Sequence, residues 1–89
     1  MPSPGPWTLQ IDPDVLKILE RIPKDYTTRI LQAIQRLPSD PYAGDIQKMK
    51  GEDKVWRRRI GSYRFLYKLF PAERIILVFH LERRTSTTY

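Results

Sequence analysis

The spacing of apolar residues changes once along this chain, at about Lys54, and this change constrains the fold more than any other feature. Before it, apolar side chains recur every three or four residues, which is typical of amphipathic helices. After it, β-branched and aromatic residues dominate with a period of two, which is typical of strands. Because 89 residues have room for one hydrophobic core, the pattern predicts a single α+β domain.

The N-terminal half predicts one strand and two helices. Residues 1–6 are rich in proline and glycine, and we expect a flexible leader there, followed by one domain over residues 7–89. Residues 7–11 alternate apolar and polar side chains as a half-buried strand does. Residues 12–22 open with an Asp-Pro pair suited to a helix N-cap and first helical position. Residues 25–37 are predicted to form a second helix that is capped by Asp25 or Thr27. The two helices then form a helical hairpin.

The C-terminal half predicts a β-meander. Residues 46–50 are a short strand or coil, and strands follow at residues 55–60, 62–69 and 74–81. Gly61-Ser62 suits a two-residue turn with positive φ at the glycine. We therefore expect a small antiparallel sheet, with the N-terminal strand, that carries both helices on one face.

The net charge of +6 comes from sixteen Lys and Arg against ten Asp and Glu, and it is unevenly placed. Residues 55–68 contain no acid and five cations: Arg57, Arg58, Arg59, Arg64 and Lys68. A basic half next to a neutral half favours a surface that meets an anion, such as nucleic acid. The alternative is an ordinary solvated surface with a high isoelectric point.

The two-residue turn sets the pairing of the hairpin. Ile60 then pairs with Tyr63 and Arg59 with Arg64, so that three arginines share the face away from the helices: Arg57, Arg59 and Arg64. The covered face receives Arg58 among apolar residues: Trp56, Ile60, Tyr63, Phe65 and Tyr67. A one-residue slip would exchange the two faces.

Two guanidinium groups directly opposite each other destabilise a strand pair by up to about 1 kcal/mol. An anion between them removes this repulsion, because the N–H donors of arginine match phosphate oxygens. The three arginines therefore predict a phosphate site. Alternatively, they extend into solvent or pair with acids such as Glu52 or Asp53.

The last ten residues hold weaker candidates. Imidazole carries protons near neutral pH, so His80 is a candidate proton carrier, although a lone histidine is more often a surface residue. Tyr89 is either a frayed terminus or, if ordered over the arginines, a group that stacks on a base.

Composition also excludes several kinds of site and location. Without cysteine there is no disulfide or thiolate metal site, and one histidine cannot form a histidine cluster, so we expect no metal and no cofactor. No apolar run approaches the ~20 residues of a membrane span, and no secretory signal is recognisable. We expect a cytoplasmic protein that does not contact a membrane.

The hairpin carries a recognisable motif. Residues 56–67 are similar to the W-R-x-R-x-G-x-Y-R-x-x-Y pattern of the RelE/ParE superfamily of bacterial and archaeal toxins, and residues 37–41 and 48–51 match weaker upstream patterns. The resemblance runs from Trp7 to Tyr89 and is greatest to the RelE-type mRNA interferases. It implies a RelE-like fold, in agreement with the order of elements above.

The resemblance implies an endoribonuclease that acts in the ribosomal A site without metal. The ribose 2′-hydroxyl attacks the adjacent phosphate, and translation stops. The implied catalytic residues are Arg57, Arg59, Arg64, Arg83 and Tyr89. Further cations are implied to bind RNA: Lys48, Lys50, Lys54 and Arg84.

In this assignment Arg57 and Arg64 clamp the transition state, Arg83 is a phosphate ligand or acid, and Tyr89 stacks and orients the hydroxyl. Arginine, with a pKa above ~12, is a poor general base, so Arg59 is a doubtful base. The base stays open between Tyr89, His80 and a ribosomal group, and the alternative is an enzyme that relies chiefly on electrostatics and on holding the RNA in line. The implied partners are a cognate antitoxin, the ribosome and mRNA. The toxin alone is expected to be a monomer and to form a hetero-oligomer with the antitoxin.

Two other functions remain open. One is a ParE-like protein that inhibits DNA gyrase without catalysis, and the other is an inactive relative that binds RNA without cutting it. The fold alone does not separate them, because function depends on the site. The five implied catalytic residues favour the nuclease.

Overall fold

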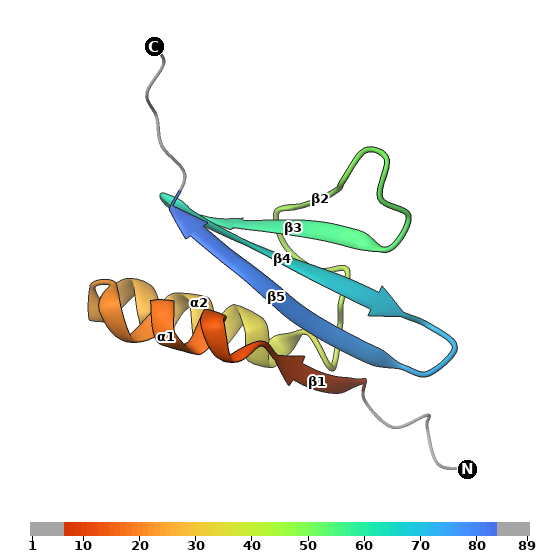
Figure 1. The fold of residues 1–89 in the computed structure, drawn as a ribbon, viewed down its shortest axis with the longest axis horizontal. Helices are drawn as coiled ribbons and strands as arrows, with labels where there is room; N and C mark the ends of the chain where they lie inside the picture. Colours follow the sequence, from red (N-terminus) through yellow and green to blue (C-terminus); the bar gives the residue numbers. More distant parts are fainter. Residues whose placement is uncertain (1–6, 84–89) are drawn as a thin grey trace.

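A computed structural model describes residues 7–83 of the chain, so the predicted leader lies outside the described residues. Within these residues, two helices and five strands form one α+β unit (Figure 1). In chain order they are β1 (Thr8–Ile11), α1 (Pro13–Arg21), α2 (Lys24–Arg36), β2 (Ile46–Lys48), β3 (Val55–Ile60), β4 (Tyr63–Phe70) and β5 (Ile75–Arg83). The predicted α+β class is confirmed.

The five strands form one sheet in the order β1-β5-β4-β3-β2. The predicted meander of β3, β4 and β5 is confirmed, and β2 adds to β3 as an antiparallel edge strand. β1 pairs with β5 in parallel, so the sheet is mixed rather than purely antiparallel. A half-buried strand alternates in the same way beside either kind of partner, so the pattern did not reveal this direction.

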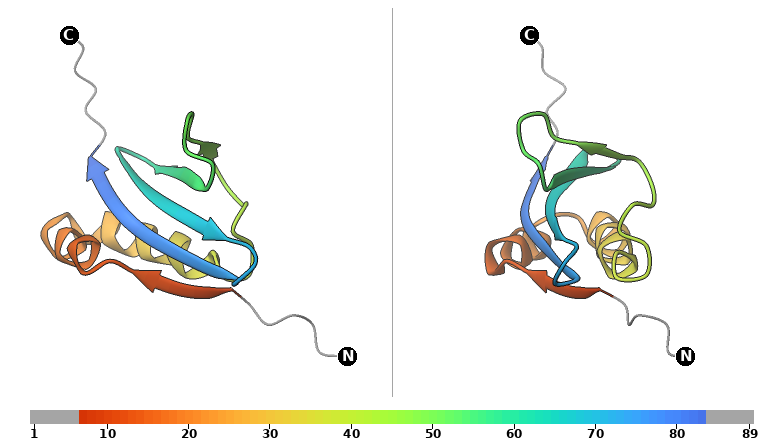
Figure 2. Two further views of the ribbon diagram at one scale, coloured as in Figure 1. Left: turned by 45° about the vertical axis from the view of Figure 1, so that its right-hand side comes forward. Right: turned by 90° about the vertical axis from the view of Figure 1, so that its right-hand side faces the viewer.

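Both helices lie together on one face of the curved sheet, behind the strands in the left view of Figure 2. Every second residue of β4 is buried beneath them: Tyr63, Phe65, Tyr67 and Leu69. Val15 and Leu19 of α1 and Ile30 and Ile34 of α2 complete the centre of this core. Burying one such side chain contributes about 1.5–3 kcal/mol, so a slip of one residue along β4 is strongly disfavoured.

The two helices begin differently. Asp12 caps α1 as predicted, with its Oδ1 accepting from the Asp14 N–H at 2.9 Å and Pro13 in the first turn. The predicted cap of α2 is wrong, because the helix begins at Lys24 and no side chain caps it. The Thr27 hydroxyl instead donates to the Leu19 carbonyl oxygen at 2.7 Å. This bond satisfies a carbonyl near the end of α1 and joins the two helices.

The turn between β3 and β4 has the geometry expected of it. Gly61 has φ +57°, and a Cβ atom there would lie 2.7 Å from Cε1 of Tyr26. Both the positive φ and the close approach of the ring require glycine. All the predicted pairs of the hairpin are present, including Arg59 with Arg64. The pairing of β4 with β5 shifts between Leu66 and Tyr67, and β5 runs on to Arg83, beyond its predicted end.

Tyr67 connects the sheet to the loop that precedes β2. Its ring is fully buried, and its hydroxyl donates to the Pro41 carbonyl oxygen at 2.8 Å. Burial raises the pKa of Tyr67 to about 12, although the Arg58 charge opposes this shift. The phenol therefore stays protonated near neutral pH, and its hydrogen bond to Pro41 ties this loop to the sheet.

Tyr67→Phe should lower the free energy of unfolding by about 1–3 kcal/mol, because the buried Pro41 carbonyl loses its donor. Since the folded-state pKa is raised, the wild type should also lose stability as the pH rises from about 10 to 12. This loss should be smaller in the variant. Urea denaturation at neutral and alkaline pH measures both effects.

Tyr63→Phe is the matched control, because Tyr63 is also buried in β4 but its hydroxyl has no hydrogen-bond partner within residues 7–83. A Tyr67→Phe protein as stable as this control at every pH would contradict the prediction.

Candidate phosphate-binding site

The register of the hairpin places three arginines on the sheet face opposite the helices, as predicted. Arg64 alternates along β4 with the buried Tyr63 and Phe65, and Arg59 is its direct partner on β3. Arg57 lies two residues before Arg59 and therefore shares its face. Neither helix covers this face (Figure 2). The side chains of Arg59 and Arg64 are partly exposed, so both are accessible to a ligand.

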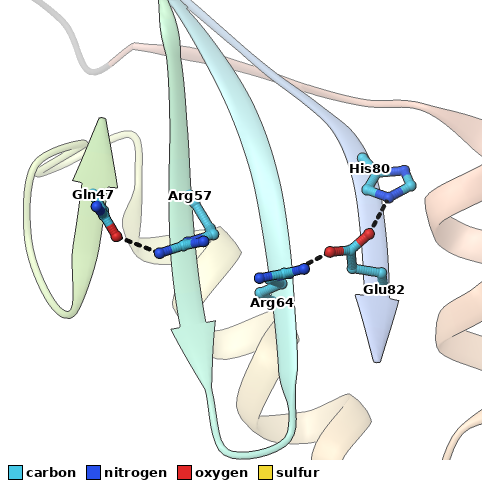
Figure 3. A network of polar contacts seen from close by, with 5 residues as sticks. All are labelled: Gln47, Arg57, Arg64, His80 and Glu82. Carbon is cyan, nitrogen blue, oxygen red and sulfur yellow. Dashed lines mark hydrogen bonds and ion pairs between the residues drawn. The ribbon is translucent and has the colours of Figure 1, made fainter. Parts of the chain in front are cut away.

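Polar partners on the flanking strands hold two of these arginines apart. Arg57 donates to Oε1 of Gln47 on β2, and Arg64 donates to Oε2 of Glu82 on β5. Figure 3 shows the two guanidinium groups turned in opposite directions, each toward its own partner. Because Glu82 is a carboxylate, its pairing with Arg64 reduces the repulsion expected between Arg64 and the directly opposed Arg59.

The alternative, in which the arginines pair with acids, is correct in part, but the acids are not the predicted Glu52 and Asp53. Glu82 pairs with Arg64, and Oδ2 of Asp45 lies 4.0 Å from Nε of Arg59. The side chains of Arg59 and Asp45 are 42 % and 71 % exposed, so this second pair contributes less than about 1 kcal/mol. Arg59 therefore remains available to an incoming anion.

Glu82 also contacts His80, the candidate proton carrier. Nε2 of His80 lies 2.8 Å from Oε1 of Glu82. A carboxylate only accepts hydrogen bonds, so Nε2 carries the proton, and in the neutral imidazole Nδ1 is left as the acceptor. The hydrogen bond from His80, together with Arg64, lowers the pKa of Glu82, although burial opposes the shift. Arg64, Glu82 and His80 thus form one hydrogen-bonded network (Figure 3).

Sequence reasoning missed Glu82. It had paired β3 with β4 from their short turn, whereas the partner of Arg64 on β5 depends on a longer turn and on the shift between Leu66 and Tyr67. Glu82 lies one residue beyond the predicted strand, two residues after His80, and this spacing was the available signal, because i and i+2 side chains of a strand share a face.

Among the described residues, the fourth predicted catalytic arginine, Arg83, does not join this network. Arg83 is the last residue of β5 and pairs with Tyr63, so its register position belongs to the helix-covered face. Its exposed position at the strand end keeps it near the edge of the site. Tyr89 lies outside the described residues.

The predicted RNA-binding lysines lie at the other end of the hairpin. Lys48 pairs with Trp56 at the β2 edge, Lys50 is in the following loop, and Nζ of Lys54 lies 5.5 Å from the centre of the Phe70 ring. Arg59 lies five residues after Lys54, about 17 Å away along the extended chain. Arg84 lies outside the described residues.

Within residues 7–83, no three side chains of His, Cys, Asp or Glu come close enough to hold a metal ion. Neither α1 nor α2 has the length and apolar character needed to cross a membrane.

A small mixed sheet with two helices on one face is the fold of solved RelE toxins, on which this chain superposes. Residues 7–86 match the family described as the ParE toxin of the type II toxin-antitoxin system, parDE. The chain belongs to this RelE/ParE family of type II toxins.

Individual relatives agree with this assignment. A protein of Methanocaldococcus jannaschii named as a toxin, RelE1, is 32 % identical over 81 residues, which cover 88 % of this chain and 90 % of the relative. The archaeal RelE–RelB complex from Pyrococcus horikoshii contains a chain that superposes with a TM-score of 0.79 at 26 % identity, over 91 % of this chain and 98 % of that one. The isolated E. coli RelE toxin superposes with a TM-score of 0.77 at 13 % identity, over 91 % and 87 % respectively.

The lowered pKa of Glu82 predicts how the network responds to acid. A carboxylate with a lowered folded-state pKa adds stability above its ordinary value of 4.5, and this stability is lost as the pH falls through the lowered pKa. Glu82→Gln should therefore be less stable than the wild type at neutral pH, by up to about 1 kcal/mol, and equally stable in acid. Chemical denaturation over a pH series measures the difference.

Glu73→Gln is the control, because it removes an exposed carboxylate from the turn between β4 and β5. A difference between the Glu82→Gln protein and the wild type that persisted unchanged in acid would contradict the network.

Proposed function

We propose that this toxin is an endoribonuclease that cuts mRNA in the ribosomal A site and so stops translation. The observation that carries the proposal is the convergence of Arg57, Arg59 and Arg64 on one open sheet face beside the pair of Glu82 and His80. The 2′-hydroxyl attacks the adjacent phosphorus, the P–O5′ bond breaks, and a 2′,3′-cyclic phosphate and a 5′-hydroxyl result. The proposed reaction uses no metal and no cofactor.

The arginines supply the electrostatic part of this mechanism. Negative charge builds up on the phosphate oxygens in the transition state, and fixed cations that face it lower the barrier. The Arg64 side chain is 33 % exposed and is held by Glu82 in a defined orientation. A bound phosphate would share its guanidinium donors with Glu82, while Arg57 and Arg59 approach from the adjacent strand.

His80 is the side chain on this face best suited to move the proton. An arginine stays protonated near neutral pH, whereas a neutral imidazole accepts a proton. The bond to Glu82 fixes the hydrogen on Nε2, so Nδ1 is the atom that would take the proton of the 2′-hydroxyl. In this role His80 is the general base and Glu82 its positioning residue.

The remaining residues complete the proposal. Arg83 would act as a phosphate ligand or acid from the end of β5, and Tyr89 would stack on a base. Four cations would hold RNA beyond the cleaved phosphate: Lys48, Lys50, Lys54 and Arg84. The similar Pyrococcus horikoshii chain is described in a complex with RelB, which supports a cognate antitoxin for this toxin as well. With the ribosome and mRNA as its other partners, the protein would act in the cytoplasm.

Arg64→Ala should reduce mRNA cleavage by about 10²–10³-fold, because it removes one fixed cation from the transition state. The fold should be retained, since the side chain lies on the open face and not in the core. Primer extension on mRNA from purified translating ribosomes measures the cut sites and their yield.

Arg21→Ala, at the end of α1, is a control that removes the same charge away from the site and should cut like the wild type. If the wild type at stoichiometric amounts leaves translation undisturbed, the nuclease assignment is wrong.

His80→Gln tests the proton transfer separately. The glutamine amide can still donate to Glu82 but cannot accept and pass on a proton, so cleavage should fall by about 10²–10⁴-fold. Binding to the ribosome should stay unchanged. Single-turnover cleavage and a ribosome pelleting assay measure the two quantities, and full cleavage by the variant would exclude His80 as the base.

The second candidate function is inhibition of DNA gyrase without catalysis. The family description that matches this chain is that of ParE toxins, which keeps this function open. A supercoiling assay with purified gyrase separates the two functions. The nuclease proposal expects no inhibition at protein concentrations that stop translation.

A further inference from the structure

A basic groove lies between α2 and the edge of β3, apart from the open sheet face. It has a volume of about 650 Å³. Nine residues line it: Arg29, Gln32, Ala33, Gln35 and Arg36 of α2, and Arg58, Arg59, Ile60 and Gly61 of the hairpin. Four of them are arginines, none is acidic, and only Ala33 and Ile60 are buried apolar residues.

The helical wall of the groove comes from one face of α2. Arg29, Gln32 and Arg36 follow each other at steps of three and four residues, so their side chains point the same way. All three are exposed. Arg29 stacks on the Tyr26 ring at 5.2 Å, and no acidic side chain within residues 7–83 pairs with Arg29 or Arg36. The two cations lie about 10 Å apart along the helix axis.

The opposite wall contains Arg58, the one charged residue on the covered face of β3. Its Nη1 donates to the Ala43 carbonyl oxygen at 3.2 Å, and its guanidinium lies against Gly44, where a Cβ atom would come within 2.3 Å of Cζ. Its Nε is buried and has no hydrogen-bond partner among the described residues. A part-buried cation without an acidic partner is costly, and an anion in the adjacent groove would offset this cost.

We propose that this groove binds the phosphodiester backbone of an RNA strand. The cations are spread along it rather than gathered at one point, which suits successive phosphates better than a single small anion. Its lining is polar and basic and lacks the aromatic or aliphatic centre of a protein interface, as is typical of surfaces that bind nucleic acid. The choice of RNA as the ligand rests on the proposed function.

Arg59 connects the groove with the open face. β2 begins opposite Arg58, and beyond it the Arg59 N–H donates to the Asp45 carbonyl oxygen at 3.1 Å, so Arg59 lies where the strand pairing of this edge stops. Arg59 both lines the groove and pairs with Arg64 across the hairpin. An RNA strand held in the groove therefore passes this edge toward the candidate phosphate site.

The test is a double variant, Arg29→Gln with Arg36→Gln, because both side chains are exposed on a helix and neither is part of the core. Lys17→Gln with Arg21→Gln removes the same charge from α1 and is the matched control. Two probes are used, a short single-stranded RNA of mixed sequence and purified small ribosomal subunits without mRNA. Fluorescence anisotropy and pelleting measure the affinity over a range of KCl concentrations.

The groove variant should bind RNA about tenfold more weakly than the control at low salt. The slope of log affinity against log salt concentration should fall by about 0.7 for each phosphate that the variant no longer neutralises. A weaker affinity for the oligonucleotide would identify the substrate strand as the occupant, and a weaker affinity for the subunits alone would identify ribosomal RNA.

Equal affinity and equal slope for the groove variant and the control, with both probes, would overturn the proposal. It would also be overturned if the variant bound an antitoxin more weakly while RNA binding stayed unchanged. Because binding is measured without cleavage, weaker RNA binding by the groove variant would support the groove even if the wild type proved not to cut mRNA.

Discussion

The burial of alternate residues on β4 is the constraint on which the rest of the structure depends. Tyr63, Phe65, Tyr67 and Leu69 all lie in the core against α1 and α2. Their burial fixes the face of the strand, and the glycine turn fixes its register against β3. Every charged residue on the open face owes its position to these two conditions, because a shift by one residue would exchange core and surface.

The same constraint assigns the hydrophobic core to one face of the sheet and the charged residues to the other. One sheet face is used for the core, so the other face can hold opposed arginines whose repulsion would be unfavourable in a structure selected for stability alone. Glu82 on the flanking strand β5 reduces this repulsion because it pairs with Arg64. Glu82 links Arg64 to His80, so the group that offsets the charge also orients the candidate base.

Arg58 shows that the two faces are not fully separate. It occupies a core-side position on β3, yet it lies at the edge where α2 and the loop before β2 leave a basic groove. Gly44 makes room for its guanidinium, and Tyr67 holds the same loop through Pro41. The loop that closes the core therefore also shapes the wall of the groove.

The sequence by itself determined the features that depend on neighbours in the chain. The helix start at Asp12, the glycine turn and the shared face of Arg57, Arg59 and Arg64 follow from capping, positive φ and a period of two, which act within a few residues. Those predictions were correct. The family motif, residues 56–67, contains the glycine turn and the three arginines. The predicted cap of the second helix failed because the helix begins at Lys24, before both predicted caps, and the Thr27 hydroxyl donates to a carbonyl of the first helix.

Only the tertiary structure decided which distant residues meet. The parallel pairing of β1 with β5, the contact of Glu82 with Arg64, and the groove between α2 and β3 all join segments far apart in the chain. Periodicity shows that a face is buried or exposed, but not which strand or helix lies beside it. Packing of the whole core determines these partners. It places Glu82 and His80 beside the predicted arginines, and it forms the second basic surface between α2 and β3.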